Sequence, residues 1–185
     1  MTAVCATRTE ARAARRAGHR AAVVGMGVRR ELPDGPLVSF GLAGALHDGI
    51  GRGEVLDATR VVDVDGAILW EGAPLGAAGA RQATILAMSG VIDDPDERRA
   101  LHRKTGADAA DMESGELARS GRLAGCLRAI SDTPSSPLGP LADVVDERGS
   151  VVWAGVARAL VRPRRTWAAL VGVRQALRSL EETAA

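Results

Sequence analysis

Aromatic residues are scarce in this sequence, which has one Phe, three Trp and no Tyr among 185 residues. Proteins that bind single-stranded nucleic acid stack its bases on aromatic side chains, so this deficit argues against such a partner. Charge of one sign is lacking as well, because 24 Lys and Arg stand against 23 Asp and Glu. The net charge therefore creates no field that attracts nucleic acid, and we expect no nucleic acid partner.

Cysteine and histidine are also few. The two cysteines, Cys5 and Cys126, lie far apart and form no C-x-x-C pair, and the three histidines are scattered. The sequence therefore predicts neither a zinc site nor a disulfide framework. We expect no metal and no organic cofactor.

Long hydrophobic runs are absent too. No stretch of about 20 apolar residues could span a bilayer. The apolar residues 1–6 precede the first arginines, whereas a secretory signal places its charge before the apolar run. The sequence therefore predicts a cytoplasmic protein, and its length is that of a single domain, residues 1–185.

Strand-like and helix-like segments alternate along the first 132 residues. The predicted strands are residues 2–6, 21–25, 37–40, 55–64, 67–70, 83–89, 107–112 and 126–131. Predicted helices begin at the capping-box pattern of Thr7 and Glu10, at Asp94 or Asp96, and at Ser114, and the second of these helices is predicted to end at Gly106. Asp65-Gly66 is a hairpin signal between the strands predicted at 55–64 and 67–70. Alternation of this kind is typical of an α/β domain with a largely parallel sheet.

The C-terminal part, residues 141–185, is predicted to be a helical extension of this domain. Residues 133–140 hold three of the eight prolines and form a loop, and Pro163 separates a helix over 151–161 from one over 164–180. The last helix has apolar residues at helical spacing: Trp167, Leu170, Val171, Leu177 and Leu180. Arg174 and Arg178 fall within that apolar arc. Docking on the chain itself or on a partner subunit is favoured, because interfacial helices usually show a cleaner basic face; peripheral contact with a membrane is the alternative.

Glycine-rich turns follow two of the predicted strands. Gly25-Met26-Gly27 lacks the dinucleotide fingerprint, because Arg30 occupies its third glycine position. The turn could present backbone N–H groups to an anion or a water, or it could be a plain tight turn. Ser39-Phe40-Gly41-Leu42-Ala43-Gly44 is small enough for the backbone to approach a ligand, or for close helix–sheet packing.

Carboxylates follow two other predicted strands. Glu113 could accept the hydroxyls of a vicinal diol, although Asp111 and Glu113 also suit the first turn of a helix. Asp132 could act as a general acid or could cap a turn. Glu10 completes a capping box and could instead orient a water or a phosphate.

Six motifs occur in the order found in one enzyme superfamily. They are Gly25-Met26-Gly27, Phe40-Gly41-Leu42-Ala43-Gly44, Arg52-Gly53-Glu54-Val55, Ser89-Gly90, Ala110-Asp111-Met112-Glu113-Ser114 and Arg128-Ala129-Ile130-Ser131-Asp132. Over residues 2–133 the chain thus resembles the purine nucleoside phosphorylase and methylthioadenosine/S-adenosylhomocysteine nucleosidase superfamily. Within it, the chain looks most like the hopanoid-associated phosphorylases, which act on adenosylhopane. The resemblance implies a three-layer α/β fold with a mixed, mostly parallel central sheet flanked by helices.

The resemblance also implies roles for individual residues. Asp132 would protonate N7 of adenine, Glu113 would hold the ribose hydroxyls, and Glu10 would orient the nucleophile. The remaining implied contacts to the substrate are Met112 under the sugar, Gly41, Leu42, Ala43 and Gly44 along sugar and base, Val91 and Ile92 beside the purine, Ser131 next to the acid, and Met26 and Gly27 in the loop nearest the nucleophile.

The implied activity is cleavage of the N-glycosidic bond of an adenosine-type nucleoside with release of adenine. The resemblance points to adenosylhopane in hopanoid biosynthesis, to phosphate as acceptor with water as the alternative, and to a homo-oligomer. Two other interpretations stay open: a 5'-methylthioadenosine/S-adenosylhomocysteine nucleosidase, and a non-catalytic nucleoside-binding relative. Only eight residues separate Gly27 from Pro36. This is too few for a crossover helix, so we predict a remodelled connection.

Overall fold

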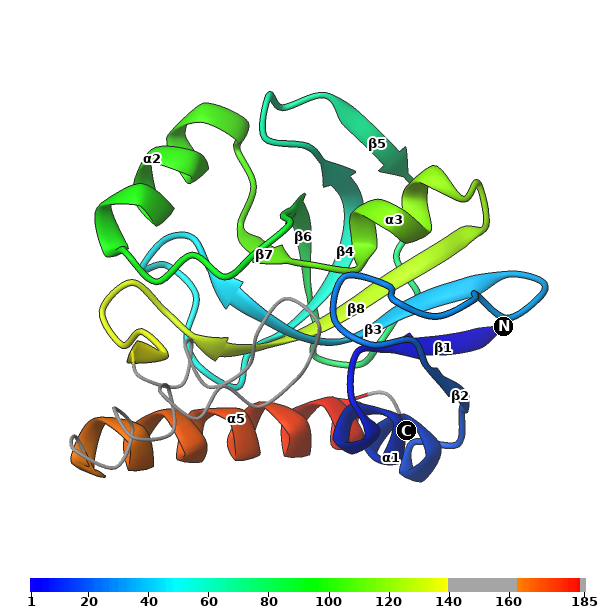
Figure 1. Cartoon of the computed structure of the whole chain (residues 1–185), viewed down its shortest axis with the longest axis horizontal. Coiled ribbons are helices and arrows are strands. Elements are labelled where there is room, and N and C mark those ends of the chain that lie inside the picture. Colours follow the sequence, from blue (N-terminus) through cyan, green and yellow to red (C-terminus); the bar gives the residue numbers. More distant parts are fainter. Residues whose placement is uncertain (140–162, 184–185) are drawn as a thin grey trace.

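The eight strands found in the part of the chain that the structure describes belong to one sheet that closes on itself (Figure 1). The computed structural model describes residues 1–139 and 163–183, without the side chains at 163–166 and 168, so the helix predicted over 151–161 lies outside the described residues. The strands are β1 (Thr2–Cys5), β2 (Arg20–Val23), β3 (Leu37–Ala45), β4 (Val55–Val62), β5 (Ile68–Glu71), β6 (Arg81–Ala87), β7 (Ala109–Asp111) and β8 (Leu123–Asp132). The helices are α1 (Arg8–Arg16), α2 (Pro95–Thr105), α3 (Ser114–Arg119) and α5 (Pro163–Thr183).

Closure of the sheet depends on β8. The strands run in the order β2-β1-β3-β7-β6-β4-β5, and β8 pairs with both β3 and β4, which completes a ring of β3, β7, β6, β4 and β8. Five pairings are parallel (β1–β2, β1–β3, β3–β8, β4–β6 and β6–β7) and three are antiparallel (β3–β7, β4–β5 and β4–β8). The mixed, mostly parallel α/β sheet is confirmed, but it forms a closed barrel and not the open central layer of the expected three-layer arrangement.

Local signals explain where the helices begin and end. The Thr7 side chain accepts a hydrogen bond from the Glu10 backbone N–H, and the Glu10 carboxylate accepts one from the Thr7 N–H, which is the predicted capping box. Asp94 caps α2, and Gly106 ends it in the left-handed conformation with φ +70°. These boundaries match the prediction because each is fixed within a few residues.

Helices cover the barrel on two opposite sides (Figure 1). α2 and α3 lie on one side, and α1 and α5 lie together on the other. Ala11 and Ala14 of α1 and Ala176 and Leu180 of α5 are buried in one cluster with Phe40 of β3. Small residues on both helices allow this close approach. Within residues 1–139 and 163–183, every helix is too short or too polar to span a bilayer.

The connection between β2 and β3 contains no helix, as predicted from its length. It opens with a tight turn in which Gly25 and Gly27 have positive φ values of +83° and +63°. The Val28 N–H donates to the Gly25 carbonyl at 3.2 Å, and the Arg29 N–H donates to the Val24 carbonyl at 2.9 Å. This turn brings the Gly27 backbone close to Glu113.

Candidate active site

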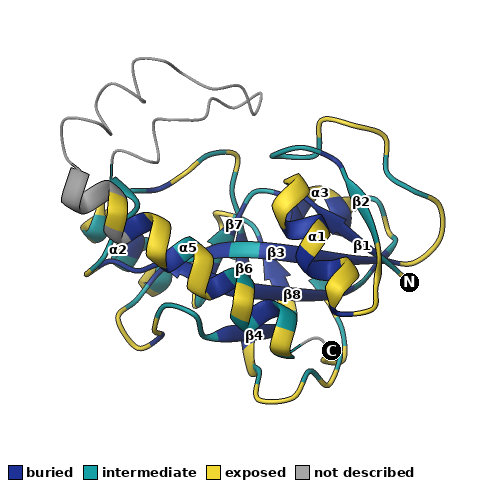
Figure 2. Ribbon diagram, turned by 90° about the horizontal axis from the view of Figure 1, so that it is seen from below, coloured by how far each residue is buried: buried dark blue, intermediate teal, exposed yellow. Residues whose placement is uncertain are grey.

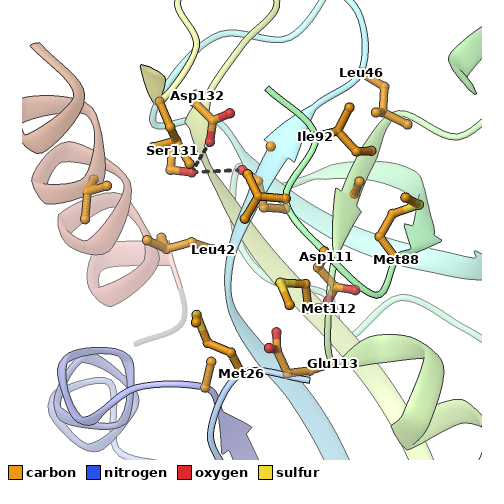
Figure 3. Close-up of a pocket in the computed structure, with 18 of the residues that line it drawn as sticks. Met26, Leu42, Leu46, Met88, Ile92, Asp111, Met112, Glu113, Ser131 and Asp132 are labelled. Carbon is orange, nitrogen blue, oxygen red and sulfur yellow. Dashed lines mark hydrogen bonds between the residues drawn. The ribbon is translucent and has the colours of Figure 1, made fainter. Parts of the chain in front are cut away.

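A cavity of about 240 Å³ lies where several strands end (Figure 3). It is lined by residues at or just beyond the carboxyl ends of β1, β3, β6, β7 and β8, together with the loop before α2 and Val173 of α5. In open α/β sheets ligands bind at such strand ends, and the closed barrel keeps this arrangement. The lining is mostly apolar, and four carboxylates and one arginine supply its charge: Glu10, Asp111, Glu113, Asp132 and Arg98.

Asp132 is held at one end of the cavity by two partners. It is 1% exposed, and its Oδ2 forms an ion pair with Nη2 of Arg98. Its Oδ1 accepts a hydrogen bond of 2.5 Å from the Ser131 hydroxyl, which also lies 3.3 Å from the Ala43 carbonyl oxygen (Figure 3). The last residue of β8 is therefore fixed in orientation with both carboxylate oxygens engaged.

Arg98 is itself anchored by the backbone. Its Nε donates to the Ile92 carbonyl at 2.8 Å, and its Nη1 donates to the Ala45 carbonyl at 3.2 Å. A Cβ added at Gly44 would lie 3.1 Å from Asp132 Oδ2 and 3.4 Å from the Arg98 guanidinium. Gly44 therefore leaves room for the ion pair at the end of β3.

Glu113 lies at the other end of the cavity, beside Met26 and Met112 (Figure 3). Its Oε1 accepts a hydrogen bond of 3.0 Å from the Gly27 N–H, and its Oε2 is 3.4 Å from Nη2 of Arg128. Burial raises the pKa of Glu113 to about 7; Arg128 opposes this shift, and the carboxylates of Asp111 and Glu10 reinforce it. Glu113 therefore changes charge near neutral pH.

Arg128 is the cation beneath these carboxylates. It is fully buried, pairs with Asp111, and donates from Nη2 to the Ser39 hydroxyl at 2.5 Å. Burial opposes its charge, but Asp111 and Glu113 outweigh that effect and raise the pKa of Arg128 above its usual value. Arg128 thus keeps its charge inside the barrel.

Glu10 both caps α1 and lines the cavity. Its Oε2 accepts from the Thr7 N–H at 2.7 Å and from the Thr7 hydroxyl at 2.8 Å, while its Oε1 accepts from the Leu42 N–H at 3.0 Å. The two interpretations of Glu10 are therefore compatible. Each carboxylate oxygen has two acceptor positions, so Oε1 keeps one for a ligand.

Eleven of the thirteen predicted site residues line this one cavity: Glu10, Met26, Leu42, Ala43, Gly44, Val91, Ile92, Met112, Glu113, Ser131 and Asp132. Gly27 is instead behind it, as the donor to Glu113. Gly41 is also outside the lining, because its backbone lies against Glu10 and Arg128.

Two arginines of the site were missed by sequence reasoning. Arg128 had a signal, because an arginine inside an apolar strand must find a buried carboxylate partner. Arg98 had no such signal, because five of the other residues in its eleven-residue helix are also charged. In the sequence it therefore looks like one more side chain of a solvent-exposed helix. Among the described residues, no three His, Cys, Asp or Glu side chains are grouped so that they could hold a metal.

Comparisons with known proteins give a likeness in structure only. No protein family model and no curated protein matches the sequence. Similar solved structures include the 5'-methylthioadenosine/S-adenosylhomocysteine nucleosidase of Helicobacter pylori with butyl-thio-DADMe-Immucillin-A, which is 14% identical at a TM-score of 0.59, with 98% of this chain and 97% of that chain covered. The same enzyme from Neisseria meningitidis, with methylthio-immucillin-A, is 15% identical at a TM-score of 0.57, with 100% and 98% covered.

A third similar structure is the futalosine hydrolase of Helicobacter pylori, which is 14% identical at a TM-score of 0.55, with 98% of this chain and 96% of that chain covered. At these identities the likeness shows that the chain has the fold of these nucleosidases and hydrolases. It does not carry their activities to this chain.

Proposed function

We propose that this protein is an enzyme that cleaves the N-glycosidic bond of an adenosine-type nucleoside and releases adenine. The observation that carries the proposal is that Asp132 and Glu113, from two separate strand ends, line the same cavity at opposite ends (Figure 3). A nucleoside between them would place its base near Asp132 and its ribose near Glu113. The shared fold with nucleosidases supports this orientation.

In the proposed reaction, Asp132 protonates N7 of the purine. Arg98 occupies Oδ2, so Asp132 takes up a proton from solvent on Oδ1, where the Ser131 hydroxyl now donates, and passes that proton to N7 as the N-glycosidic bond breaks. That hydroxyl has a second acceptor in the Ala43 carbonyl, toward which it turns when Oδ1 is protonated. Protonation makes adenine a better leaving group, and general acid catalysis of this kind contributes about 10²–10⁴-fold.

Glu113 stabilises the sugar as its ring becomes positively charged. The ionised carboxylate accepts the ribose hydroxyls, while Gly27 and Arg128 hold its two oxygens in place. Its interaction with the ring strengthens as positive charge develops, so it lowers the barrier and does not merely tighten binding.

Water is the acceptor that the charges of the site favour. Glu10, Asp111 and Glu113 all influence the pKa of Arg128, so this side of the cavity, where the nucleophile would lie, is rich in negative charge. A phosphate dianion would be repelled there, whereas Glu10 Oε1 retains an acceptor position that suits a water and that takes the proton the water loses when its oxygen bonds to the sugar. We therefore propose hydrolysis, although the family resemblance implied phosphate as co-substrate.

Adenosylhopane is the substrate that the resemblance suggests, and the rim of the cavity supports a substrate with an apolar tail. The cavity is smaller than the roughly 300–1,000 Å³ typical of drug-sized ligands, so it would hold the nucleoside and leave a lipid outside. Leu138, Val173 and the half-exposed Val91 give such a tail an apolar rim. Peripheral contact of α5 with a membrane belongs to the same proposal, while a homo-oligomer and a cytoplasmic location stay predictions.

A methylthioadenosine/S-adenosylhomocysteine nucleosidase is the second candidate, favoured by the small cavity volume. Incubation with each nucleoside, with and without phosphate, followed by chromatography for free adenine separates the candidates. We expect adenine release that does not depend on phosphate, and a loss of about 10²–10⁴-fold in Asp132→Asn. Adenine binding without turnover in both the wild type and Asp132→Asn would instead identify a non-catalytic relative. Adenine release that strictly needs phosphate would contradict hydrolysis.

A further inference from the structure

The outer face of α5 combines exposed apolar side chains with arginines. Trp167, Leu170 and Val171 are 64%, 40% and 45% exposed, although large apolar side chains are usually covered. An α-helix repeats every 3.6 residues, so Trp167 and Val171 share one face with the exposed Arg174 and Arg178. The opposite face is buried, and Leu180 lies there against the barrel. The apolar arc predicted from the sequence is thus exposed at Trp167, Leu170 and Val171 and buried at Leu180.

The outer face of α1 is basic. Arg8, Arg12 and Arg15 recur at helical spacing and are exposed, with Arg16 beside them, whereas the inner face is alanine. Arg16 pairs with Glu181 of α5 at 2.9 Å, which joins the two helices. Figure 2, seen from below, shows both helices with their exposed residues toward the viewer. We call this combined surface the α1–α5 face.

Most arginines of the α1–α5 face have no carboxylate partner. Within residues 1–139 and 163–183, Arg8, Arg12, Arg174 and Arg178 form no ion pair. On the other side of the barrel, three exposed cations of α2 and α3 are neutralised, Arg99 by Asp48, Lys104 by Asp65 and Arg119 by Glu116, and among the described residues only Arg103 of these helices is exposed without an ion pair. The balanced total charge therefore conceals a local excess of positive charge.

We infer that the α1–α5 face binds an anionic lipid surface. Arginine supplies attraction to anionic headgroups, and Trp with aliphatic side chains on the same face suits the headgroup boundary. A nucleic acid would leave the aliphatic residues unexplained, and two copies of this face would oppose arginine to arginine. The inference rests on exposure and charge, so it stands whether or not the proposed reaction is correct.

The same two helices also border the cavity, through Val173 of α5 and Thr7 at the start of α1. If the proposed function holds, docking of the α1–α5 face would bring the apolar rim to the bilayer boundary. A nucleoside carried on a lipid could then enter the cavity while its tail stays among lipids.

Co-sedimentation with phosphatidylcholine vesicles, with and without phosphatidylglycerol, tests the inference. We expect the full chain to bind only the anionic vesicles, and to be released by salt because exposed charges are screened. Arg12→Glu and Arg178→Glu should each weaken binding by at least about fivefold, the effect of roughly one cation near such a surface. Trp167→Ser should weaken it as well.

Arg103→Glu is the matched control, since it reverses an exposed arginine on α2 at the same change in net charge. Unchanged thermal unfolding of each variant excludes misfolding. Equal binding to neutral and anionic vesicles, or an equal loss in Arg103→Glu, would overturn the inference. Binding to a DNA duplex that responds to the same variants would reassign the face to nucleic acid, and a dimer lost in Trp167→Ser without vesicle binding would reassign it to a second copy. Adenine release from a soluble nucleoside, measured in parallel, reports separately on the proposed function.

Discussion

Glu113 has its titration near neutral pH because it is buried among other carboxylates. Its pKa is raised from 4.5 to about 7, so the folded protein holds this proton more tightly than the unfolded chain does. The resulting stability is fully present below pH 4.5 and is lost as the pH rises through 7. In the proposed reaction, by contrast, the ribose diol needs the ionised carboxylate of Glu113, so stability and activity should change in opposite directions over this range.

Glu113→Gln removes the titration. Between about pH 4 and pH 8, we expect the free energy of unfolding of the wild type to fall relative to the variant by up to about 3 kcal/mol. Urea denaturation at a series of pH values measures this difference. Glu116→Gln, an exposed change in the next turn, is the control and should show no such trend. A constant difference between wild type and Glu113→Gln would contradict the assignment.

Arg98 and Asp132 form a buried pair in which each group needs the other. Arg98→Met would leave Asp132 as an unpaired buried charge, and we expect a loss of roughly 3–5 kcal/mol in the free energy of unfolding at pH 7. Adding Asp132→Asn removes that charge and should restore most of the loss, whereas Arg99→Met, on the exposed neighbour, should change little. Chemical denaturation of the three variants measures these changes in the free energy of unfolding. A double variant less stable than Arg98→Met alone would contradict the mutual dependence of Arg98 and Asp132.

At the scale of elements, β3 shows how a glycine-rich segment can be part of a strand. The sequence predicted that the strand stops at Phe40, but pairing with β8 carries it through Gly41 to Ala45. The glycines let buried charges approach: a Cβ at Gly41 would lie 2.8 Å from Arg128 Nη1 and 2.9 Å from Glu10 Cδ. The glycines of β3 therefore leave room for the charged side chains of the site to pack against its backbone.

Gly41→Ala should displace Glu10 and Arg128 and reduce adenine release by an order of magnitude or more, since small misplacements at a reacting centre can slow it about 10²-fold. Gly51→Ala is the matched control, because an added Cβ there meets nothing within 4 Å. Turnover of both variants, with circular dichroism to verify folding, makes the comparison. Full activity in Gly41→Ala would show that this contact does not matter.

Features that depend on a few neighbouring residues were predicted from the sequence, whereas features that depend on contacts between distant segments were not. The capping box of α1, the ends of α2 and the β4–β5 hairpin follow from a few neighbouring residues. The candidate site followed from motifs at strand ends. Arg98 reaches Asp132 only through the folded arrangement, 34 residues along the chain, so no spacing rule could find it.

At the scale of the whole molecule, closure of the barrel could not be deduced from alternating strands and helices. It requires that β8 pair along both edges, parallel to β3 and antiparallel to β4. The distribution of charge could not be deduced either, because the totals of 24 basic and 23 acidic residues do not reveal the basic α1–α5 face. Both properties are set by which segments meet in three dimensions.

Closure predicts a gradient of local stability. β8 is paired on both sides within the ring, whereas β2 and β5 each pair with one neighbour among the described strands. We expect the backbone amides of β8 to exchange with deuterium most slowly and those of β2 and β5 fastest, since opening an edge strand breaks fewer contacts. Hydrogen exchange followed by mass spectrometry measures this order, and faster exchange in β8 than in β5 would contradict a closed ring.

β8 also sets the spacing between two charged residues of the site. Arg128 and Asp132 are four residues apart on β8, where Arg128 pairs with Gly41 and Asp132 with Gly44 across a register shift, so their backbones are separated by no more than about 13 Å. In the proposed reaction, the sugar end and the base end of the site are thus separated by a length that the backbone geometry of β8 sets. Substitutions that adapt the protein to new substrates would have to lie beyond that span, at the rim of the cavity, where side chains can change without altering the spacing along β8.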